Sequence, residues 1–334
     1  MNGTVPSVEA FAEAARAALG RWDLGDAKLA LFAHRENAVF KVDTGDASYA
    51  LRVHRPGYHD DAALASELAW MRALAQAGVE VPAIVPAADG ELFVKVRADG
   101  IAAPVQVDLI EWIDGEPLAV GARHGKAAEA GWVRDQWGRL GALAAALHEH
   151  SAGWQPPAGF VRHAWDEHGL AGPDPLWGRF WELPALDAGQ RALLLEARDR
   201  LFRELAALPK SRDAYGLIHA DLLPENVLVC GERLRVIDFD DCGYGWHLFE
   251  IVTALYAVEG EPWYAEACDA FIEGYRTRRP LDDAALARLP LFFLARVLTD
   301  VGWMHTRAET ENARRSTAAR VASACALAED YLRA

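Results

Sequence analysis

The sequence predicts an α+β fold in two lobes, a small strand-rich lobe over residues 1–113 and a larger, mainly helical lobe over residues 114–334. Two observations lead to this prediction. Short β-prone runs dominate the first third of the chain, whereas apolar residues recur at helical spacing over most of the remainder. Two more short apolar runs interrupt the helical part within residues 216–240, so we expect a few strands there as well.

The first lobe begins with a predicted β-hairpin. Its two β-prone runs, 38–42 and 49–53, are joined by the sequence DTGD at 43–46, whose Gly and Asp residues suit a tight turn. A helix should follow, capped by Asp60 or Asp61, and it is the only helix that we expect in this lobe. Two further short strands are expected at 92–96 and 105–110.

The second lobe follows a linker-like sequence, DGEP, at 114–117. Beyond it we expect helices at 132–150, 186–208, 246–258, 263–277, 284–307 and 314–332. A loop rich in Pro and Trp lies between the first two of these helices, at 151–184. The short apolar runs 227–229 and 234–237 are split by Gly231, which predicts a second hairpin.

The composition argues against several classes of protein. Of the 334 residues, 52% are hydrophobic and 25% charged, which is typical of a globular chain. No run approaches the roughly 20 apolar residues of a membrane span, and the N-terminus lacks a signal-peptide pattern. A net charge of −15 argues against binding to nucleic acid. The four cysteines form no CxxC pair, so we expect neither a structural metal site nor disulfides, and we expect a cytoplasmic location.

The strongest functional signal is the sequence HADLLPEN at 219–226, followed by VIDFD at 236–240. Asp221 and Asn226 lie five residues apart on one short loop, and Asp238 follows the predicted hairpin. Phosphoryl transfer needs a carboxylate that accepts or orients the proton of the attacking hydroxyl, and oxygen ligands that hold Mg²⁺ against the phosphates. A lone Asp in a loop is usually a turn former, but this combination at hairpin distance predicts a phosphotransfer site.

These two segments, HADLLPENVLV and VIDFDD, resemble the catalytic and metal-binding loops of the aminoglycoside phosphotransferase and choline kinase-like family. Within that family the chain is similar to type II homoserine kinases and to bacterial stress-response Ser/Thr kinases. The resemblance implies a two-lobed protein-kinase-like fold that uses ATP and Mg²⁺. It implies that Asp221 is the catalytic carboxylate, that Asn226 and Asp238 are metal ligands, and that His219 supports the loop from behind.

The resemblance also implies a cation for the phosphates of ATP. Arg52 lies where the family's third strand carries a lysine, so Arg52 takes that role. Arg and Lys are not interchangeable, but a guanidinium can grip phosphate oxygens through two parallel hydrogen bonds. Glu67 borders the apolar stripe of the following helix and is expected to pair with Arg52. The alternative is a surface Arg and a solvated Glu.

Two further nucleotide contacts are expected in the first lobe. The phosphate-covering turn, HRENAVF from His34, contains no glycine, so Asn37 is expected to bond a phosphate or to order the loop. His34 and Arg35 can supply charge there, and a plain hairpin turn is the alternative. By the resemblance, the backbone groups of Glu111 and Ile113 hold the edge of the adenine.

Recognition of the phosphate acceptor belongs to the second lobe. We expect five residues to border the acceptor pocket: Asp240, Tyr244, Trp246, Asp300 and Trp303. The first three lie in or directly after the predicted metal loop, and the last two lie on a later helix that also carries Arg296. The many tryptophans of this lobe can form a cage for a quaternary ammonium by cation–π attraction, although burial in a core is their more usual role.

Three functions remain in view. We favour a kinase that phosphorylates the hydroxyl of a small molecule, such as homoserine, an amino alcohol or an aminoglycoside. The second is a Ser/Thr protein kinase of the bacterial stress-response type, although Leu223 stands where eukaryotic-type protein kinases carry a lysine. The third is a non-catalytic nucleotide-binding regulator, against which the full set of Asp221, Asn226 and Asp238 argues. The oligomeric state stays open.

Overall fold

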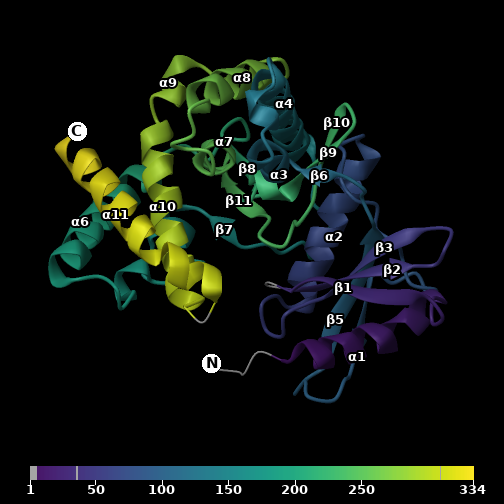
Figure 1. The fold of residues 1–334 in the computed structure, drawn as a ribbon. Helices are drawn as coiled ribbons and strands as arrows, with labels where there is room; N and C mark the ends of the chain where they lie inside the picture. The colour runs from purple at the N-terminus through teal and green to yellow at the C-terminus, as the bar shows by residue number, and fades with distance from the viewer. Residues whose placement is uncertain (1–5, 35–36, 309) are drawn as a thin grey trace. The chain divides into compact units, whose positions relative to one another are not determined.

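The computed structural model describes residues 6–34, 37–308 and 310–334 (Figure 1). The chain forms two compact units. The first, which we call the sheet unit, consists of Met1–Glu116, Gln155–Arg162 and Leu228–Ile237. The second, the helical unit, consists of Pro117–Trp154, His163–Val227 and Asp238–Ala334. Our division into functional lobes at residues 113 and 114 stays a prediction beside these units.

The sheet unit is built on five antiparallel strands in the order β1-β2-β3-β5-β4. The strands are β1 (Lys28–His34), β2 (Ala38–Asp43), β3 (Ser48–Val53), β4 (Phe93–Val96) and β5 (Val105–Glu111). The predicted hairpin is confirmed as β2 and β3. Its turn depends on Gly45, which has φ +89° and donates its N–H to the Asp43 carboxylate at 2.8 Å.

The described residues of the sheet unit include two α-helices, α1 (Val8–Leu19) and α2 (Asp61–Gln76), and a 3₁₀ turn at Gly20–Trp22. The predicted cap of α2 is Asp60, whose Oδ1 accepts the N–H of Ala63 at 2.8 Å. Our expectation of a single helix was wrong, because α1 precedes the sheet. Ser7 caps α1, and Phe11 packs with small alanines on its buried side. Alanines carry a weak apolar signal, so the helical period was easy to miss.

A second, small sheet has the order β10-β9-β6. Its strands are β6 (Glu116–Pro117), β9 (Val227–Cys230) and β10 (Arg233–Val236). The predicted hairpin at 227–237 is therefore present as β9 and β10, with Gly231 at φ +63° in the turn. This hairpin lies between the two loops of the functional motif, and it is the chain that connects Asn226 to Asp238.

The helical unit contains six long helices, close to those predicted, among the described residues. They are α4 (Trp132–Gly153), α6 (Ala188–Ala206), α7 (His247–Tyr256), α8 (Tyr264–Arg276), α10 (Leu289–Thr306) and α11 (Glu311–Arg333). The single helix predicted over 284–307 is in fact two, α9 (Asp283–Leu286) and α10. Pro290 lies in the first turn of α10, where its missing N–H is tolerated, whereas it would break a continuous helix.

Shorter elements complete the helical unit. They are α3 (Leu118–Arg123), α5 (Glu167–Ala171), and the 3₁₀ turns Lys126–Ala128, Phe180–Glu182 and Pro224–Asn226. A three-stranded sheet has the order β7-β11-β8, with β7 (Ala164–Trp165), β8 (Tyr215–Ile218) and β11 (Gly243–Trp246). The end of β8 delivers the chain to residue 219, and β11 begins at residue 243, so this sheet fixes both ends of the functional motif. In the part of the chain that is described, no helix is long and apolar enough to span a membrane.

Candidate active site

The loop after β8 brings the first two predicted site residues together. Asn226 donates its Nδ2–H to the backbone oxygen of Asp221 and to its Oδ2, both at 2.9 Å. Backbone bonds from Leu223 to Asp221 and from Asn226 to Leu223 close the loop into a tight turn. The spacing of five residues therefore places the two side chains in contact. Their roles in catalysis and metal binding stay predictions.

A buried carboxylate on α7 holds the start of this loop. Glu250 accepts the backbone N–H of His219 at 2.8 Å and that of Ala220 at 2.6 Å, and its side chain is fully buried. Burial raises the pKa of Glu250, and the two N–H donors oppose that rise. Ala220 has φ +66°, a conformation unusual for any residue but glycine, and the two bonds stabilise it. The His219 ring packs edge-on against Phe239, 4.6 Å away, as a residue behind the loop would.

An arginine from α10 contacts the other oxygen of Asp221. Arg296 donates an N–H to Asp221 Oδ1 at 3.1 Å and another to the carbonyl of Ala220 at 3.4 Å. Only 2% of Arg296 is exposed. Burial raises the pKa of Asp221 to about 6, with Arg296 opposing the rise and the nearby Asp241 adding to it. The sequence placed Arg296 only on a neighbouring helix, and nothing in its spacing indicated this contact.

The second loop, before β11, carries three carboxylates, those of Asp238, Asp240 and Asp241, and each has different surroundings. Asp238 is exposed and has φ +67°, whereas Asp240 is only 3% exposed. The backbone oxygen of Asp241 accepts the indole N–H of Trp165 at 2.8 Å, and its Oδ1 accepts that of Trp177 at 3.2 Å. The three carboxylates thus have different surroundings, and Asp238, the predicted metal ligand, is the one that is exposed.

In the sheet unit, Arg52 lies in a buried cluster of charges. It donates two N–H groups to the Asp108 carboxylate at 2.9 and 2.8 Å and a third to Glu67 at 2.9 Å. The expected contact between Arg52 and Glu67 is therefore present, while its role toward a nucleotide stays a prediction. His54 lies 2.6 Å from the same Asp108, and Arg162 lies 3.9 Å from Glu67. Despite full burial, Arg52 and His54 hold the pKa of Asp108 down at about 2.

Three further residues, Asn37, Glu111 and Ile113, were predicted to contact the nucleotide. Asn37 accepts the backbone N–H of Arg55 at 3.1 Å, so it ties the first turn to the end of β3. Arg35 lies outside the described residues. The N–H of Glu111 donates to the Ala83 carbonyl at 2.7 Å, so a contact of Glu111 with an adenine would have to use its carbonyl. The expected contacts of Glu111 and Ile113 with adenine stay predictions. Ile113 is 9% exposed at the end of this segment.

A model of the phosphotransferase enzyme family matches residues 28–281 of the chain. The chain belongs to this family. Amicoumacin kinase of Bacillus subtilis (strain 168) is 26% identical over 86% of this chain and 83% of its own length. A homoserine kinase of Rhizobium etli is 27% identical, with 81% of each chain covered. The predicted family and the prediction of a kinase-type phosphotransferase are thereby confirmed.

Solved structures of phosphotransferases confirm the predicted kinase-like fold. A microcompartment-associated aminopropanol kinase superposes with a TM-score of 0.82 at 37% identity, over 96% of this chain and 97% of its own. The amicoumacin kinase hAmiN, in complex with AMP-PNP, Ca²⁺ and Ami, gives 0.73 at 25% identity, over 89% and 87%. Since both likenesses extend over nearly the full chains, they include the sheet-rich and the helical parts alike.

The residues predicted for the acceptor side of the phosphotransferase are dispersed. Asp300 accepts the hydroxyl of Tyr256 at 2.6 Å and pairs with Arg320 at 2.8 Å. Trp303 is part-buried against the main core of the helical unit. Tyr244 is half-buried on β11, and burial raises the pKa of its hydroxyl. These residues stay candidates for acceptor recognition.

Trp246 needs a correction. It is 2% exposed, donates its indole N–H to the Pro209 carbonyl at 3.3 Å, and packs against Tyr215 and Phe292. A side chain so enclosed serves packing, so we leave it out of the phosphotransferase's acceptor pocket. Trp165 and Trp177 are likewise part of this core, which favours ordinary burial over a cage for a quaternary ammonium.

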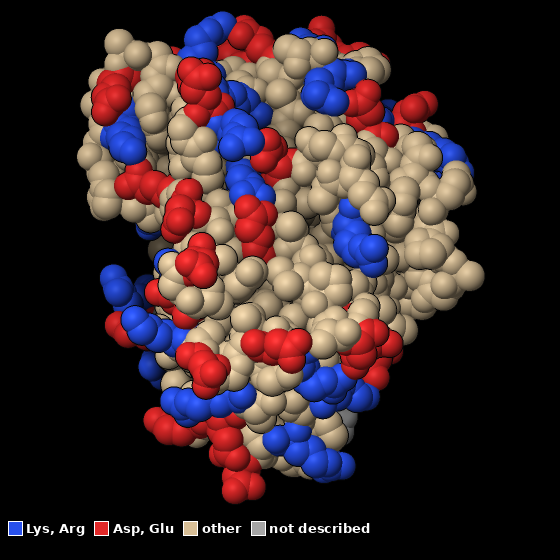
Figure 2. Space-filling model, turned by 90° about the vertical axis from the view of Figure 1, so that its right-hand side faces the viewer, with Lys and Arg blue, Asp and Glu red and all other residues tan. Residues whose placement is uncertain are grey.

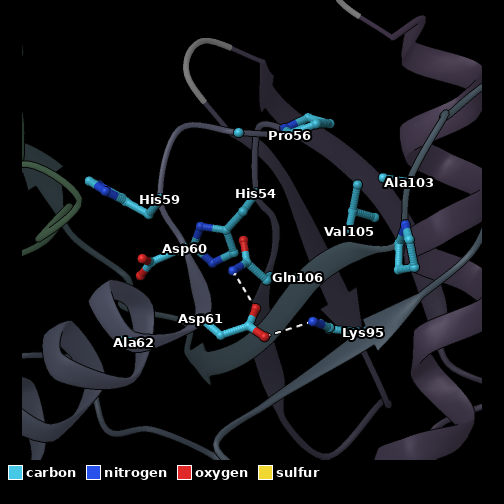
Figure 3. Close-up of a pocket in the computed structure, with 12 residues that line it drawn as sticks. His54, Pro56, His59, Asp60, Asp61, Ala62, Lys95, Ala103, Val105 and Gln106 are labelled. Carbon is cyan, nitrogen blue, oxygen red and sulfur yellow. Dashed lines mark hydrogen bonds and ion pairs between the residues drawn. The ribbon is translucent and has the colours of Figure 1, made fainter. Parts of the chain in front are cut away.

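The phosphotransferase also has a hollow of about 440 Å³ in the sheet unit, beside the start of α2 (Figure 3). Asp61 lies between Lys95 and Gln106, with bonds of 2.6 and 2.9 Å. His54 is among the lining residues, so the hollow adjoins the charge cluster of Arg52. On the face seen in Figure 2, acidic and basic side chains are interspersed and do not gather by sign.

Proposed function

We propose that this phosphotransferase transfers the γ-phosphate of ATP to the hydroxyl of a small amino alcohol. The observation that carries the proposal is the loop in which Asp221 contacts Asn226 through one carboxylate oxygen and Arg296 through the other. The likeness to an aminopropanol kinase, at 37% identity over 96% of the chain, favours an amino alcohol. Homoserine and aminoglycosides are the alternative small-molecule acceptors.

Asp221 would orient the acceptor hydroxyl and accept its proton as the phosphoryl group is transferred. In phosphoryl transfer the protein contributes mainly positioning and electrostatic stabilisation, so a carboxylate held by two donors suits the role. With a pKa raised to about 6, most Asp221 side chains are ionised at neutral pH while remaining basic enough to take up a proton.

The residues at this site fit a magnesium ion. Because Asn226 turns its Nδ2 toward Asp221, its amide oxygen is the atom that can serve as a ligand, and Asp238 adds an exposed carboxylate. No three His, Cys, Asp or Glu side chains form a metal cage within the described residues. In kinases Mg²⁺ is bound through one or two carboxylates together with phosphates and water. When bound, the ion would neutralise charge on the phosphates.

For the nucleotide, we propose that residues 1–113 form the binding lobe and 114–334 the catalytic and acceptor-binding lobe. Arg52 would provide positive charge toward the phosphates, with its guanidinium plane fixed by Asp108 and Glu67. Asn37, Glu111 and Ile113 would contribute at the phosphate turn and the base. We place the reaction in the cytoplasm, since widely spaced cysteines without CxxC pairs are typical of a reducing compartment.

The test is ADP release from Mg²⁺-ATP with a panel of acceptors. The panel holds aminopropanol, ethanolamine, choline, homoserine, several aminoglycosides and a Ser/Thr-rich protein. Asp221→Ala is the blank, and Asp174→Ala, an exposed carboxylate paired with Arg179, is the matched control. We expect release with an amino alcohol that is lost only in Asp221→Ala. Release driven by the protein alone would instead establish a protein kinase, and an inactive chain that still binds Mg²⁺-ATP would support a regulator.

A further inference from the structure

We propose that Arg296 is the positioning residue that fixes the Asp221 carboxylate for phosphoryl transfer, held in turn by the rings of Trp177 and Tyr256. We call these three side chains the arginine clamp. The inference rests on the proposed function, because it concerns how the catalytic carboxylate of that function is oriented. None of the three was predicted to act on Asp221 from the sequence.

The contacts of the clamp restrict Asp221 from one side. Arg296 reaches Oδ1 at 3.1 Å, while Asn226 reaches Oδ2 at 2.9 Å, so each carboxylate oxygen has its own donor. A second N–H of Arg296 faces the Ala220 carbonyl at 3.4 Å. Because one planar guanidinium contacts both the side chain and the preceding backbone, rotation of the carboxylate would break these contacts.

Aromatic rings hold the guanidinium in place. Its central carbon lies 4.9 Å from the ring of Trp177 and 5.7 Å from that of Tyr256. The Tyr256 ring also contacts the Arg320 guanidinium at 4.6 Å, and its hydroxyl donates to Asp300. Cation–π contacts strengthen when they are shielded from water, and only 2% of Arg296 is exposed. The guanidinium thus has little freedom to leave Asp221.

Trp177 also connects the clamp to the second loop of the site. Its indole N–H donates to Asp241 Oδ1 at 3.2 Å, and its carbonyl accepts the hydroxyl of Thr306 at 3.0 Å. The backbone approaches α10 so closely that a Cβ atom on Gly302 would lie 2.6 Å from the Gly178 carbonyl oxygen. The backbone at Trp177 is therefore held against α10, while its indole contacts both Arg296 and the loop that carries Asp238.

A positioning role predicts a specific kinetic pattern. Losing Arg296 should lower kcat and leave nucleotide binding intact, because the carboxylate is needed in the transition state and Arg52 holds the nucleotide. Arg296→Ala should lower kcat by about 10²-fold, with the KM for ATP changed by less than about threefold. Arg296→Lys should lower kcat by about tenfold, because an ammonium cannot reproduce the planar contacts.

The experiment measures Mg²⁺-ATP turnover of these variants with the acceptor found for the wild type and with water as acceptor. Millimolar guanidinium chloride is then added, since a free guanidinium can fill the space left in Arg296→Ala and should raise kcat by at least about fivefold. Arg200→Ala is the matched control. Arg200 also lies over a tyrosine ring and pairs with a carboxylate, but on α6, and its loss should change neither kcat nor the response to guanidinium.

Thermal unfolding decides how each result is interpreted. Wild-type kcat in Arg296→Ala or Arg296→Lys would overturn the inference. So would a loss of kcat that guanidinium does not reverse in a variant that unfolds at the wild-type temperature. If Arg296→Ala does not fold, the Lys variant and Trp177→Phe, which removes the N–H to Asp241, decide through the same readouts. The last possible outcome is that ATP is hydrolysed with water as acceptor, that this hydrolysis depends on Arg296, and that no phosphate is transferred to any other acceptor. This outcome would contradict the proposed acceptor class, but it would support the arginine clamp.

Discussion

Two pairs of arginine and aspartate, a fully buried one in the sheet unit and a partly exposed one in the helical unit, have opposite electrostatic outcomes. In the sheet unit, Arg52 contacts Asp108 with two parallel bonds and His54 adds a third contact, so the pKa of Asp108 falls to about 2. In the helical unit, burial and the nearby Asp241 raise the pKa of Asp221 to about 6, and the single bond of 3.1 Å from Arg296 does not offset that rise. The same pairing of residue types therefore does not have a fixed effect.

The two aspartates differ in how fully nearby cations compensate their negative charge. The sheet-unit cluster pairs Arg52 and Arg162 with Asp108 and Glu67, and all four side chains are buried. A carboxylate of this kind has little tendency to accept a proton. Asp221 is under-compensated by comparison, and this is what a proton acceptor near neutral pH requires. In the proposed mechanism, the arginine clamp orients Asp221 and leaves it able to accept a proton.

The largest expected effect comes from the change of Asp221 to Asn. This isosteric change removes the proton acceptor, so kcat should fall by about 10³-fold. The free energy of unfolding should fall less than for a change at the buried Asp108, because burial already disfavours the charged form of Asp221. ADP release and urea unfolding measure the two quantities, with nucleotide binding followed by calorimetry. Turnover at the wild-type rate would remove the assignment of Asp221 as the catalytic carboxylate.

The same change at the other pair, Asp108→Asn, should act mainly on stability. It leaves Arg52 and His54 without their shared carboxylate in a buried place, which should lower the free energy of unfolding by about 3–5 kcal/mol. Urea unfolding measures the loss. Asp89→Asn, at an exposed carboxylate paired with Arg21, should leave the midpoint unchanged. Equal stability of the two variants would show that the cluster does not stabilise the fold.

A third expected effect is a stability loss in mild acid that arises in the helical unit. The rings of His148 and His247 stack at 4.1 Å, and burial lowers the pKa of both well below 6.5. Below about pH 6.5 the unfolded chain therefore binds protons that the folded chain does not, and stability present above that pH is lost as the pH falls toward the folded pKa values. Each histidine contributes about 1.4 kcal/mol per pH unit in that window.

Urea unfolding at a series of pH values between neutral and mildly acidic tests this effect. His148→Gln with His247→Gln should flatten the dependence. The Asp108 pair differs, because a folded pKa of about 2 keeps its contribution intact until the pH falls below the ordinary value of 3.8. Asp221 takes up a proton near pH 6 in the folded chain and so opposes part of this loss, and the comparison with the double variant removes that contribution. Equal slopes for the wild type and the double variant would mean that the two histidines are not held neutral.

The smallest expected effect is at the phosphate turn. Asn37→Ala removes the hydrogen bond from the Arg55 N–H, which should weaken the turn by about 1 kcal/mol and raise the KM for ATP by less than about tenfold. Initial rates at varied ATP measure this change. An unchanged KM would mean that the turn is ordered without Asn37 and that the nucleotide depends on the Arg52 cluster alone.

Much of the fold was predictable, because hairpins and long helices depend on local patterns. The turn at Gly45 and the cap at Asp60 are examples in which the neighbouring residues alone favour the observed structure. Local patterns failed for α1, whose buried side is largely alanine, and at Pro290, where one expected helix became two. In both places the determining feature was small, a weak apolar stripe or a single missing N–H.

The site was predictable only where its residues are close in sequence. Asp221 and Asn226 are five residues apart, and their contact follows from the loop between them. Glu250, Arg296 and Asp108 were missed as partners because they lie 31, 75 and 56 residues from the groups they contact. Such contacts are set by the packing of helices and strands, and no spacing in the sequence indicates them.

The composition of the sheet unit has a consequence for how the chain acquires its structure during synthesis. Its first 116 residues contain all five strands of the main sheet, but two later stretches complete it. Arg162 reaches Glu67, and Arg235 reaches Glu111 with bonds of 2.7 Å. A nascent chain on the ribosome therefore exposes an unfinished sheet unit until residue 237 has emerged. A fragment that ends at residue 116 would lack these partners, so the unit is a product of the whole chain.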